Sequence, residues 1–177
     1  MLSKHQFQLL LNLKNKTEKT NQRAIAEELG FSLGTVNKLI QEAEQQEWIT
    51  SEYELTEKGL KALEPYRVEN AIIMAAGMST RFAPLSYETP KGLLVVKGER
   101  LIEREIKQLR EAGIQKITVV VGYMKEKMFY LADKFGVEIV VNEDYYRYKN
   151  CSSLLLVRGQ LGNTYICSSD NYFVENT

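Results

Sequence analysis

Residues 71–94 read AIIMAAGMSTRFAPLSYETPKGLL, and this stretch decides the fold of the larger part of the chain. An apolar run that ends in small residues is typical of a buried strand leading into a turn. The turn contains Arg81, and Lys91 follows ten residues later. Backbone amides in such a turn can bind phosphate oxygens, and the two cations can neutralise their charge. The stretch therefore predicts a loop that binds a nucleoside triphosphate.

From residue 70 onward, apolar runs alternate with amphipathic segments. We expect strands at 71–75, 117–121, 137–141 and 164–168, and helices near 102–112, 125–135 and 153–160. This alternation predicts a three-layer, Rossmann-like α/β domain with a mainly parallel sheet. Ligands in such sheets bind at the carboxyl ends of the strands, where Gly77, Gly122, Asn142 and Asp170 are expected to meet.

The first part of the chain has a different, helical pattern. Asn21 and Ser32 can each cap a helix, and Gly30 can end the first of the two. The second predicted helix has an apolar stripe of Leu33, Val36, Ile40 and Ala43, and an earlier helix has one of Phe7, Leu10 and Leu11. Two short strands near 48–49 and 53–55 and a helix over 56–63 complete the pattern. We therefore predict two domains, residues 1–65 and 66–177.

This order of elements resembles a winged helix-turn-helix domain, and residues 55–59 (LTEKG) resemble the same segment of MarR-type regulators. The resemblance implies DNA binding through the helix that starts after Ser32. Residues 1–64 contain eight Lys or Arg against ten Glu, a formal balance of −2, and the reading helix offers only Lys38. DNA affinity depends on phosphate neutralisation. A structural, regulatory or homodimer-forming role is therefore favoured over DNA binding, although Lys14, Lys16, Lys19 and Arg23 offer a second basic patch.

Composition excludes several other classes of function. The formal net charge of the 177 residues is zero, so no overall basic field attracts nucleic acid. Two cysteines and the single His5 do not support a zinc site or a histidine-dependent triad. No apolar run approaches membrane-spanning length. We expect a cytoplasmic protein with reduced thiols, in which Cys151 and Cys167 are buried.

Two common phosphate-binding motifs are absent from the loop. A Walker A loop requires G-x-x-x-x-G-K-[ST] and a dinucleotide-binding turn requires three glycines, whereas residues 77–82 contain only Gly77. The segment instead resembles the nucleotidyltransferase signature A-A-G-x-G-[ST]-R followed by P-K. The matching residues are Ala75, Ala76, Gly77, Thr80, Arg81, Pro90 and Lys91. The chain departs from the signature at Ser79, where many family members have glycine.

Residues 142–153 and the strand that ends before Asp170 resemble bacterial CTP:phosphocholine cytidylyltransferases, a branch of the sugar-nucleotide pyrophosphorylase-like superfamily. The resemblance implies transfer of CMP from CTP to phosphocholine. It assigns the triphosphate to Arg81, the α-phosphate region and the acceptor to Lys91, and Mg²⁺ to Asp170. The nucleotide-binding residues that it implies are Ala75, Ala76, Gly77, Met78, Ser79, Thr80, Gly122 and Asn142.

Three points stay open at this stage. Ser152 and Ser153 are expected to cap the helix near 153–160, and Tyr145, Tyr146 and Tyr148 are unplaced candidates for a pocket around the acceptor's quaternary ammonium. Because family members continue well past the strand that carries the metal-binding Asp, we expect the chain to be an amino-terminal part of a longer enzyme. A sugar-1-phosphate nucleotidyltransferase and a DNA-binding regulator with a nucleotide-sensing domain remain alternatives.

Overall fold

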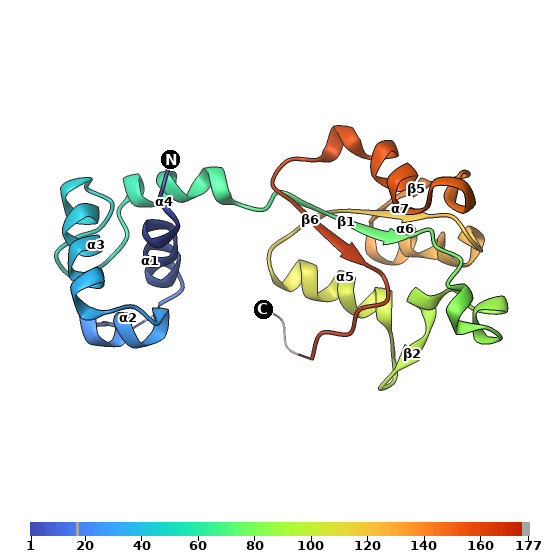
Figure 1. Cartoon of the computed structure of the whole chain (residues 1–177), viewed down its shortest axis with the longest axis horizontal. Helices are drawn as coiled ribbons and strands as arrows, with labels where there is room; N and C mark the ends of the chain where they lie inside the picture. Colours follow the sequence, from blue (N-terminus) through green and yellow to red (C-terminus); the bar gives the residue numbers. More distant parts are fainter. Residues whose placement is uncertain (17, 175–177) are drawn as a thin grey trace. The chain divides into compact units, whose positions relative to one another are not determined.

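The computed structural model describes residues 1–16 and 18–174, which form two compact units, Met1–Arg67 and Val68–Thr177 (Figure 1). Each unit has its own hydrophobic core. The helices of the first unit are α1 (Lys4–Lys14), α2 (Gln22–Leu29), α3 (Leu33–Gln45), α4 (Glu57–Leu63) and the 3₁₀ helix η1 (Glu64–Tyr66).

The helices of the first unit begin and end where the sequence predicts. The side chain of Asn21 accepts hydrogen bonds from the amides of Arg23 and Ala24 at the start of α2, and Ser32 accepts one from Thr35 at the start of α3. Gly30 ends α2 in the left-handed conformation, with φ of 67°. These contacts satisfy amides that the first turn of a helix leaves unpaired.

Two details of the first unit differ from expectation. Leu11 and Leu33 are 38% and 47% exposed, whereas Leu9, Leu13 and Leu39 are buried in their place. In α1 and α3 the buried face is therefore rotated relative to the predicted apolar stripe. The direction from which neighbouring helices pack decides which face is buried, and the spacing of apolar residues in the sequence does not specify that direction. The predicted wing is reduced to one antiparallel bridge between Ile49 and Leu55.

Several of the basic side chains considered for DNA binding form ion pairs with neighbouring glutamates. Lys38 lies 3.9 Å from Glu42 on α3, and Lys16 and Lys19 form ion pairs with Glu28 and Glu52. Each pair neutralises a charge that a phosphate contact would need. DNA binding remains a prediction, and these pairs do not favour it.

The second unit contains a four-stranded parallel sheet in the order β5-β4-β1-β6. Its strands are β1 (Asn70–Ala75), β4 (Lys116–Val121), β5 (Glu138–Val141) and β6 (Thr164–Ser168), and β2 (Val95–Val96) pairs with β3 (Glu99–Arg100) in a separate hairpin. Since Ala75 pairs with Val121 and Met74 with Ser168, the carboxyl ends of three strands lie at one edge of the sheet.

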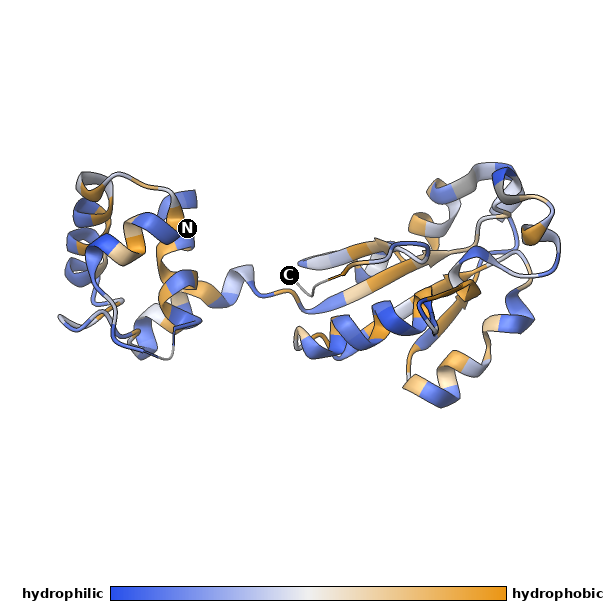
Figure 2. Cartoon of the chain, turned by 90° about the horizontal axis from the view of Figure 1, so that it is seen from below, coloured by the Kyte–Doolittle hydropathy of each residue, from blue (hydrophilic) through white to orange (hydrophobic). Residues whose placement is uncertain are grey.

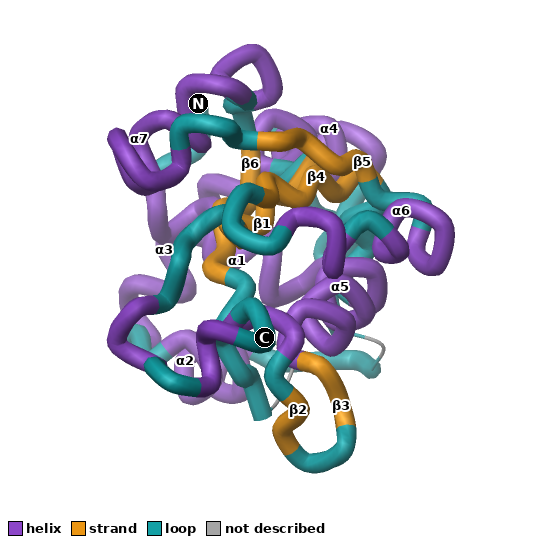
Figure 3. Tube along the Cα trace, turned by 90° about the vertical axis from the view of Figure 1, so that its right-hand side faces the viewer, coloured by secondary structure: helices purple, strands orange, loops and turns teal. Residues whose placement is uncertain are grey.

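Helices cover both faces of this sheet. The α-helices are α5 (Leu101–Glu111), α6 (Tyr130–Phe135) and α7 (Tyr145–Leu156), and the 3₁₀ helices are η2 (Thr80–Phe82), η3 (Leu85–Tyr87), η4 (Lys91–Leu93), η5 (Lys125–Met128) and η6 (Arg158–Gln160). Figure 3 shows α7 on one side and α5 and α6 on the other. Ile73 and Val119 face α5 and α6, whereas Ile72 and Val120 pack against Val157. In Figure 2 the strands are mainly hydrophobic, and the three-layer α/β prediction is confirmed.

The last helix corrects two predictions. Helix α7 begins at Tyr145 rather than near Ser153, and Ser152 and Ser153 therefore lie inside it instead of capping it. Cys167 is buried as expected, but Cys151 on α7 is exposed. Within the part of the chain that the structure describes, no helix is both long and apolar enough to span a bilayer.

Candidate functional site

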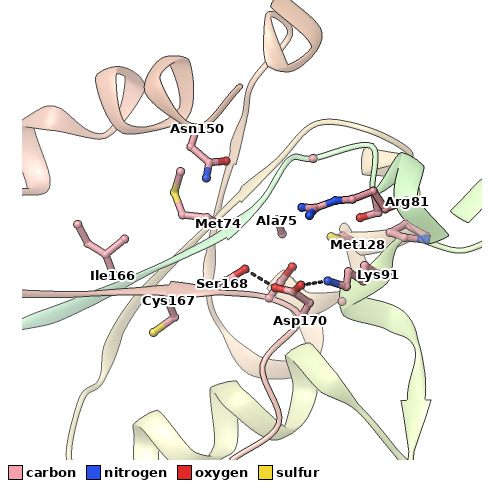
Figure 4. A pocket seen from close by; sticks show the side chains of 15 residues that line it. Met74, Ala75, Arg81, Lys91, Met128, Asn150, Ile166, Cys167, Ser168 and Asp170 are labelled. Carbon is pink, nitrogen blue, oxygen red and sulfur yellow. Dashed lines mark hydrogen bonds and ion pairs between the residues drawn. The ribbon is translucent and has the colours of Figure 1, made fainter. Parts of the chain in front are cut away.

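A cavity of about 580 Å³ opens at the carboxyl ends of β1 and β6 (Figure 4). The segment after β1 contributes Gly77, Ser79 and Arg81, and the start of η4 contributes Pro90 and Lys91. Strand β6 and the loop after it contribute residues 166–170. The cavity therefore brings together the two ends of the loop that the sequence predicts to bind phosphate.

The turn after β1 has an unusual backbone. Ser79 adopts the left-handed conformation, with φ of 51° and ψ of 39°. Only glycine adopts this region without strain. The departure from the family signature therefore falls on a position where the backbone itself favours glycine. Gly77 does not have a positive φ, and a Cβ atom added there would meet no atom within 4 Å.

Lys91 and Asp170 meet in this cavity. The Nζ atom of Lys91 donates a hydrogen bond to Oδ2 of Asp170, and the hydroxyl of Ser168 donates one to Oδ1. Figure 4 shows the three side chains as a chain of hydrogen bonds across the cavity floor. Partial burial disfavours the charged carboxylate, but the hydrogen bonds from Lys91 and Ser168 outweigh it, so the pKa of Asp170 lies below its ordinary value. Asp170 is therefore ionised at neutral pH.

Close packing fixes the two partners of this pair. A Cβ atom on Gly92 would lie 3.0 Å from both Cβ and Oγ of Ser169. Gly92 follows Lys91 and Ser169 precedes Asp170, so η4 packs directly against the residue that follows β6. Only a residue without a side chain leaves room for this approach.

The predicted nucleotide-binding residues divide into two groups. Ala75, Gly77 and Ser79 line the cavity together with Arg81 and Lys91, but five others do not: Ala76, Met78, Thr80, Gly122 and Asn142. Ala76 is buried, and a Cβ atom on Gly122 would lie 2.9 Å from the carbonyl oxygen of Ala76 and from the ring of Tyr145. Packing between segments explains glycine at position 122. A nucleotide contact of these five residues stays a prediction.

Asn142 is 1% exposed and its side chain is fully used within the protein. Its Nδ2 atom donates to the hydroxyls of Ser152 at 2.8 Å and Ser153 at 2.9 Å, and its Oδ1 atom accepts from the amide of Asp144 at 3.0 Å. These hydrogen bonds tie the residue after β5 to the N-cap of α7 and to two consecutive serines within that helix. Asn142 therefore positions α7, and this explains why the two serines lie inside the helix.

Sequence reasoning missed several residues that line the cavity, among them Met74, Asn150 and Ser168. Ser168 and Asp170 are separated by two positions at the end of a strand, and that spacing places both side chains on one face. The period of the strand was therefore a usable signal for Ser168. Asn150 gave no such signal, because no side-chain cap marks the start of α7 at Asp144.

The described residues offer few ligands for a metal ion. Over residues 1–16 and 18–174, no group of three or more His, Cys, Asp or Glu side chains is placed to hold one. Asp170 contributes a carboxylate and Ser168 a hydroxyl. Magnesium is commonly held by one or two carboxylates while substrate phosphates and water complete its coordination. This donor set therefore fits Mg²⁺ only together with a phosphate ligand.

Residues 71–175 match the family model of the MobA-like NTP transferase domain, and this range contains the whole cavity. The chain belongs to the MobA-like NTP transferase family. Residues 8–78 match a second family model, described as wHTH-PRTase associated, in agreement with the winged helix-turn-helix expected for the first unit.

Two curated relatives match this chain over similar lengths. The choline-phosphate cytidylyltransferase of Streptococcus pneumoniae is 46% identical over 106 residues, which are 60% of this chain and 46% of the relative. The 2-aminoethylphosphonate cytidylyltransferase of Lancefieldella rimae is 46% identical over 104 residues, covering 57% and 42%. The chain thus spans about half the length of the curated relatives it matches.

A solved structure also resembles the NTP transferase domain. It is the CTP:phosphocholine cytidylyltransferase from Streptococcus pneumoniae, which aligns with a TM-score of 0.61 and 45% identity. The alignment covers 63% of this chain and 49% of that structure. The likeness in structure and sequence supports the nucleotidyltransferase fold of the second unit.

Proposed function

We propose that this protein takes part in the transfer of CMP from CTP to phosphocholine, with CDP-choline and pyrophosphate as products. The single observation that carries the proposal is the cavity in which Arg81, Lys91 and Asp170 come together at the carboxyl ends of β1 and β6. Although Lys91 pairs with Asp170, Arg81 leaves the charged lining residues with a net positive charge, which suits a polyphosphate better than a neutral ligand. The cytidylyltransferase names of the two relatives support cytosine as the base.

Gly77 supports a ligand at the turn after β1. Its φ does not require glycine, and a Cβ atom there would meet no protein atom within 4 Å. Folding therefore does not explain a glycine at this position. A ligand that approaches the backbone closely would explain it, since a side chain would fill the same space. We assign this place to the triphosphate of CTP, beside Arg81.

The proposed reaction needs no histidine or other general base. The second pKa of a phosphate monoester is about 6, so phosphocholine is already ionised at neutral pH. One of its oxygens attacks the α-phosphorus of CTP in line, the bond to the β-phosphate oxygen breaks, and its electrons leave with pyrophosphate. Arg81 binds the triphosphate, and Lys91 orients the α-phosphate and the attacking phosphate and offsets the repulsion between them.

Mg²⁺ is part of the proposal, with Asp170 and Ser168 as the protein groups that would hold it. When bound, it would neutralise charge on the phosphate oxygens. Asp170 also orients Lys91 through the hydrogen bond between them.

We further propose a cytoplasmic location, because reduced cysteines such as Cys151 and Cys167 persist there.

A second acceptor is favoured by a specific observation. The relative named for 2-aminoethylphosphonate is as similar as the one named for choline phosphate, at 46% identity. Both acceptors combine a phosphate or phosphonate with a cationic nitrogen. Glucose-1-phosphate lacks that cation, and we keep it as the less favoured alternative.

Isothermal titration of the chain with CTP in the presence of Mg²⁺ tests the proposal. Loss of one charged hydrogen bond is worth about 1.5–3 kcal/mol, so Arg81→Ala is expected to weaken CTP binding at least about tenfold. Arg23→Ala in the first unit serves as the matched control. No binding of CTP by the unmutated chain, or tighter binding of GTP than of CTP, would count against the proposal.

Pyrophosphate release then identifies the acceptor. Phosphocholine, 2-aminoethylphosphonate and glucose-1-phosphate are each supplied with CTP, UTP, ATP or GTP. We expect release with CTP and one of the two zwitterionic acceptors. Release only with glucose-1-phosphate would replace the proposal by its sugar-phosphate alternative.

A further inference from the structure

The cavity has two chemically different sides. Figure 4 shows Arg81 and Lys91 on one side, whereas Asn150, Met74 and Ile166 lie on the other. The second side contains a thioether, an aliphatic side chain and one neutral amide. Because the phosphates go to the cations, this neutral side receives a different part of the ligand.

The neutral side does not suit the acceptor's cationic nitrogen. A quaternary ammonium is recognised by aromatic faces or by carboxylates. Among the described lining residues there is no aromatic side chain, and the only carboxylate is that of Asp170, which pairs with Lys91. A flat heteroaromatic ring suits it better, since a methionine sulfur and aliphatic carbons can pack against the ring while an amide meets its polar edge.

Asn150 is held in place for such a contact. It lies on α7, two and three positions before Ser152 and Ser153, whose hydroxyls accept hydrogen bonds from the buried Asn142. At the start of the same helix, Tyr145 packs against Gly122 so closely that a Cβ atom there would lie 2.9 Å from the tyrosine ring. Gly122 and Asn142 thus fix the helix that carries Asn150, although neither lines the cavity.

We propose that Asn150 is a base-binding residue, whose side-chain amide hydrogen-bonds the polar edge of the nucleobase while Met74 packs against the ring. Gly122 and Asn142 are positioning residues that act through α7. The inference rests on the proposed function, because it takes the ligand to be a nucleoside triphosphate. Beyond the proposed function, the inference specifies the side of the cavity that binds the base and the side chain that contacts the base.

Titration with two ligands tests this role, CTP and inorganic tripolyphosphate, each with Mg²⁺. Tripolyphosphate has the three phosphates but no base. Asn150→Ala is expected to weaken CTP binding about tenfold, the equivalent of about 1.4 kcal/mol, and to leave tripolyphosphate binding within about twofold. Arg81→Ala is expected to weaken the binding of both CTP and tripolyphosphate. Asn37→Ala, the same change at an exposed position of helix α3, is the matched control and is expected to change neither.

Each outcome decides between the two levels of the proposal. If the unmutated chain binds neither ligand, the proposed function fails, and the inference fails with it. If both ligands bind and Asn150→Ala lowers the affinity for both equally, or for neither, the assignment of Asn150 to the base is overturned while the phosphate site stands. A melting temperature of Asn150→Ala close to that of the unmutated chain excludes unfolding as the cause of weaker CTP binding.

Discussion

Lys91 and Asp170 form an ion pair between residues that are 79 positions apart in the sequence. The pair joins the end of the loop after β1 to the end of β6, so the two halves of the predicted phosphate site are one structure. It also leaves the depressed pKa of Asp170 dependent on Lys91. Any change at one residue therefore alters the charge or the orientation of the other.

Lys91→Met tests this dependence, because methionine keeps much of the length of lysine and removes the ammonium. With the hydrogen bond lost and the partial burial retained, the pKa of Asp170 is expected to rise. CTP affinity is expected to fall at least about tenfold, as for other charged hydrogen bonds. Carbon-13 NMR titration of the aspartates and calorimetry with CTP measure the two effects. Lys116→Met, at an exposed position of β4, is the control, and an unchanged pKa of Asp170 in Lys91→Met would contradict the pairing.

Gly122→Ala is expected to destabilise the second unit. The new methyl group would lie 2.9 Å from the carbonyl oxygen of Ala76, a backbone atom that cannot move easily. Overpacking of this kind costs about 1–3 kcal/mol, which denaturant unfolding measures. Gly159→Ala is the control, since a Cβ atom there meets no atom within 4 Å and φ is not positive. Equal stability of the two variants would refute the close packing at Gly122.

Gly77→Ala is expected to separate stability from binding. The added methyl group meets no protein atom, so the free energy of unfolding should change by less than about 1 kcal/mol. CTP affinity should fall, because the methyl group occupies the space assigned to the triphosphate. Calorimetry with CTP, alongside denaturant unfolding, distinguishes the two effects. Undiminished CTP affinity would show that the nucleotide does not approach this backbone.

Ser79→Gly is expected to stabilise the loop slightly. The left-handed conformation at Ser79 costs about 1–2 kcal/mol for a residue with a side chain, and glycine removes this cost. The greater freedom of glycine in the unfolded chain offsets part of the stability gained. A net gain of about 0.5 kcal/mol should appear in denaturant unfolding. Ser79→Val is the opposing variant, since a β-branched residue tolerates this conformation poorly. Stabilisation by valine would contradict the strained turn.

Glu105 on α5 is expected to make stability depend on pH. Glu105 is 3% exposed, and the thiol of Cys167, a weak hydrogen-bond donor, offsets only part of the burial of its carboxylate. Burial raises its pKa to about 7, with a smaller contribution from the charge of Asp170. In the unfolded chain the same group has its ordinary value of 4.5. The folded state therefore binds more protons between these values, and the stability present below pH 4.5 is lost as the pH rises towards 7.

Glu105→Gln removes this titration. The free energy of unfolding that the protein loses between pH 5 and pH 8 should therefore be smaller in the variant, by roughly 1–3 kcal/mol. The variant should be more stable than the unmutated chain at pH 8. Thermal or denaturant unfolding across this range measures the difference. Glu126→Gln, at an exposed position, should leave the pH dependence as it is. A profile unchanged by Glu105→Gln would mean that this carboxyl does not titrate as its burial requires.

Local patterns made most of the fold predictable. Continuous apolar runs identified β1 and β4 because strands covered on both faces need apolar residues at every position. Caps such as Asn21 and Ser32 act within three residues, so the helices after them were placed correctly. Helix α7 was misplaced because its start has no such side-chain cap.

The candidate site was predictable where a motif occupies neighbouring residues, and at Asp170, which follows the end of a predicted strand. The turn from Gly77 to Arg81 and the pair Pro90-Lys91 lie close together in the sequence. The structure places five of their residues around one cavity: Gly77, Ser79, Arg81, Pro90 and Lys91. Gly122 and Asn142 were predicted at the same edge of the sheet, but the structure uses them to hold α7. Residue type and position along a strand do not reveal whether a side chain faces a cavity or a neighbouring helix.

The sequence by itself determined the order of strands and helices, the turn after β1 and the family, because each depends on contacts within a few residues or on a contiguous motif. Only the tertiary structure decided that Lys91 pairs with Asp170, that Gly92 lies against Ser169, and that Asn150 faces the cavity. These relationships join segments that are far apart in the chain, and they follow from how helices and strands pack, which no local pattern of side chains specifies.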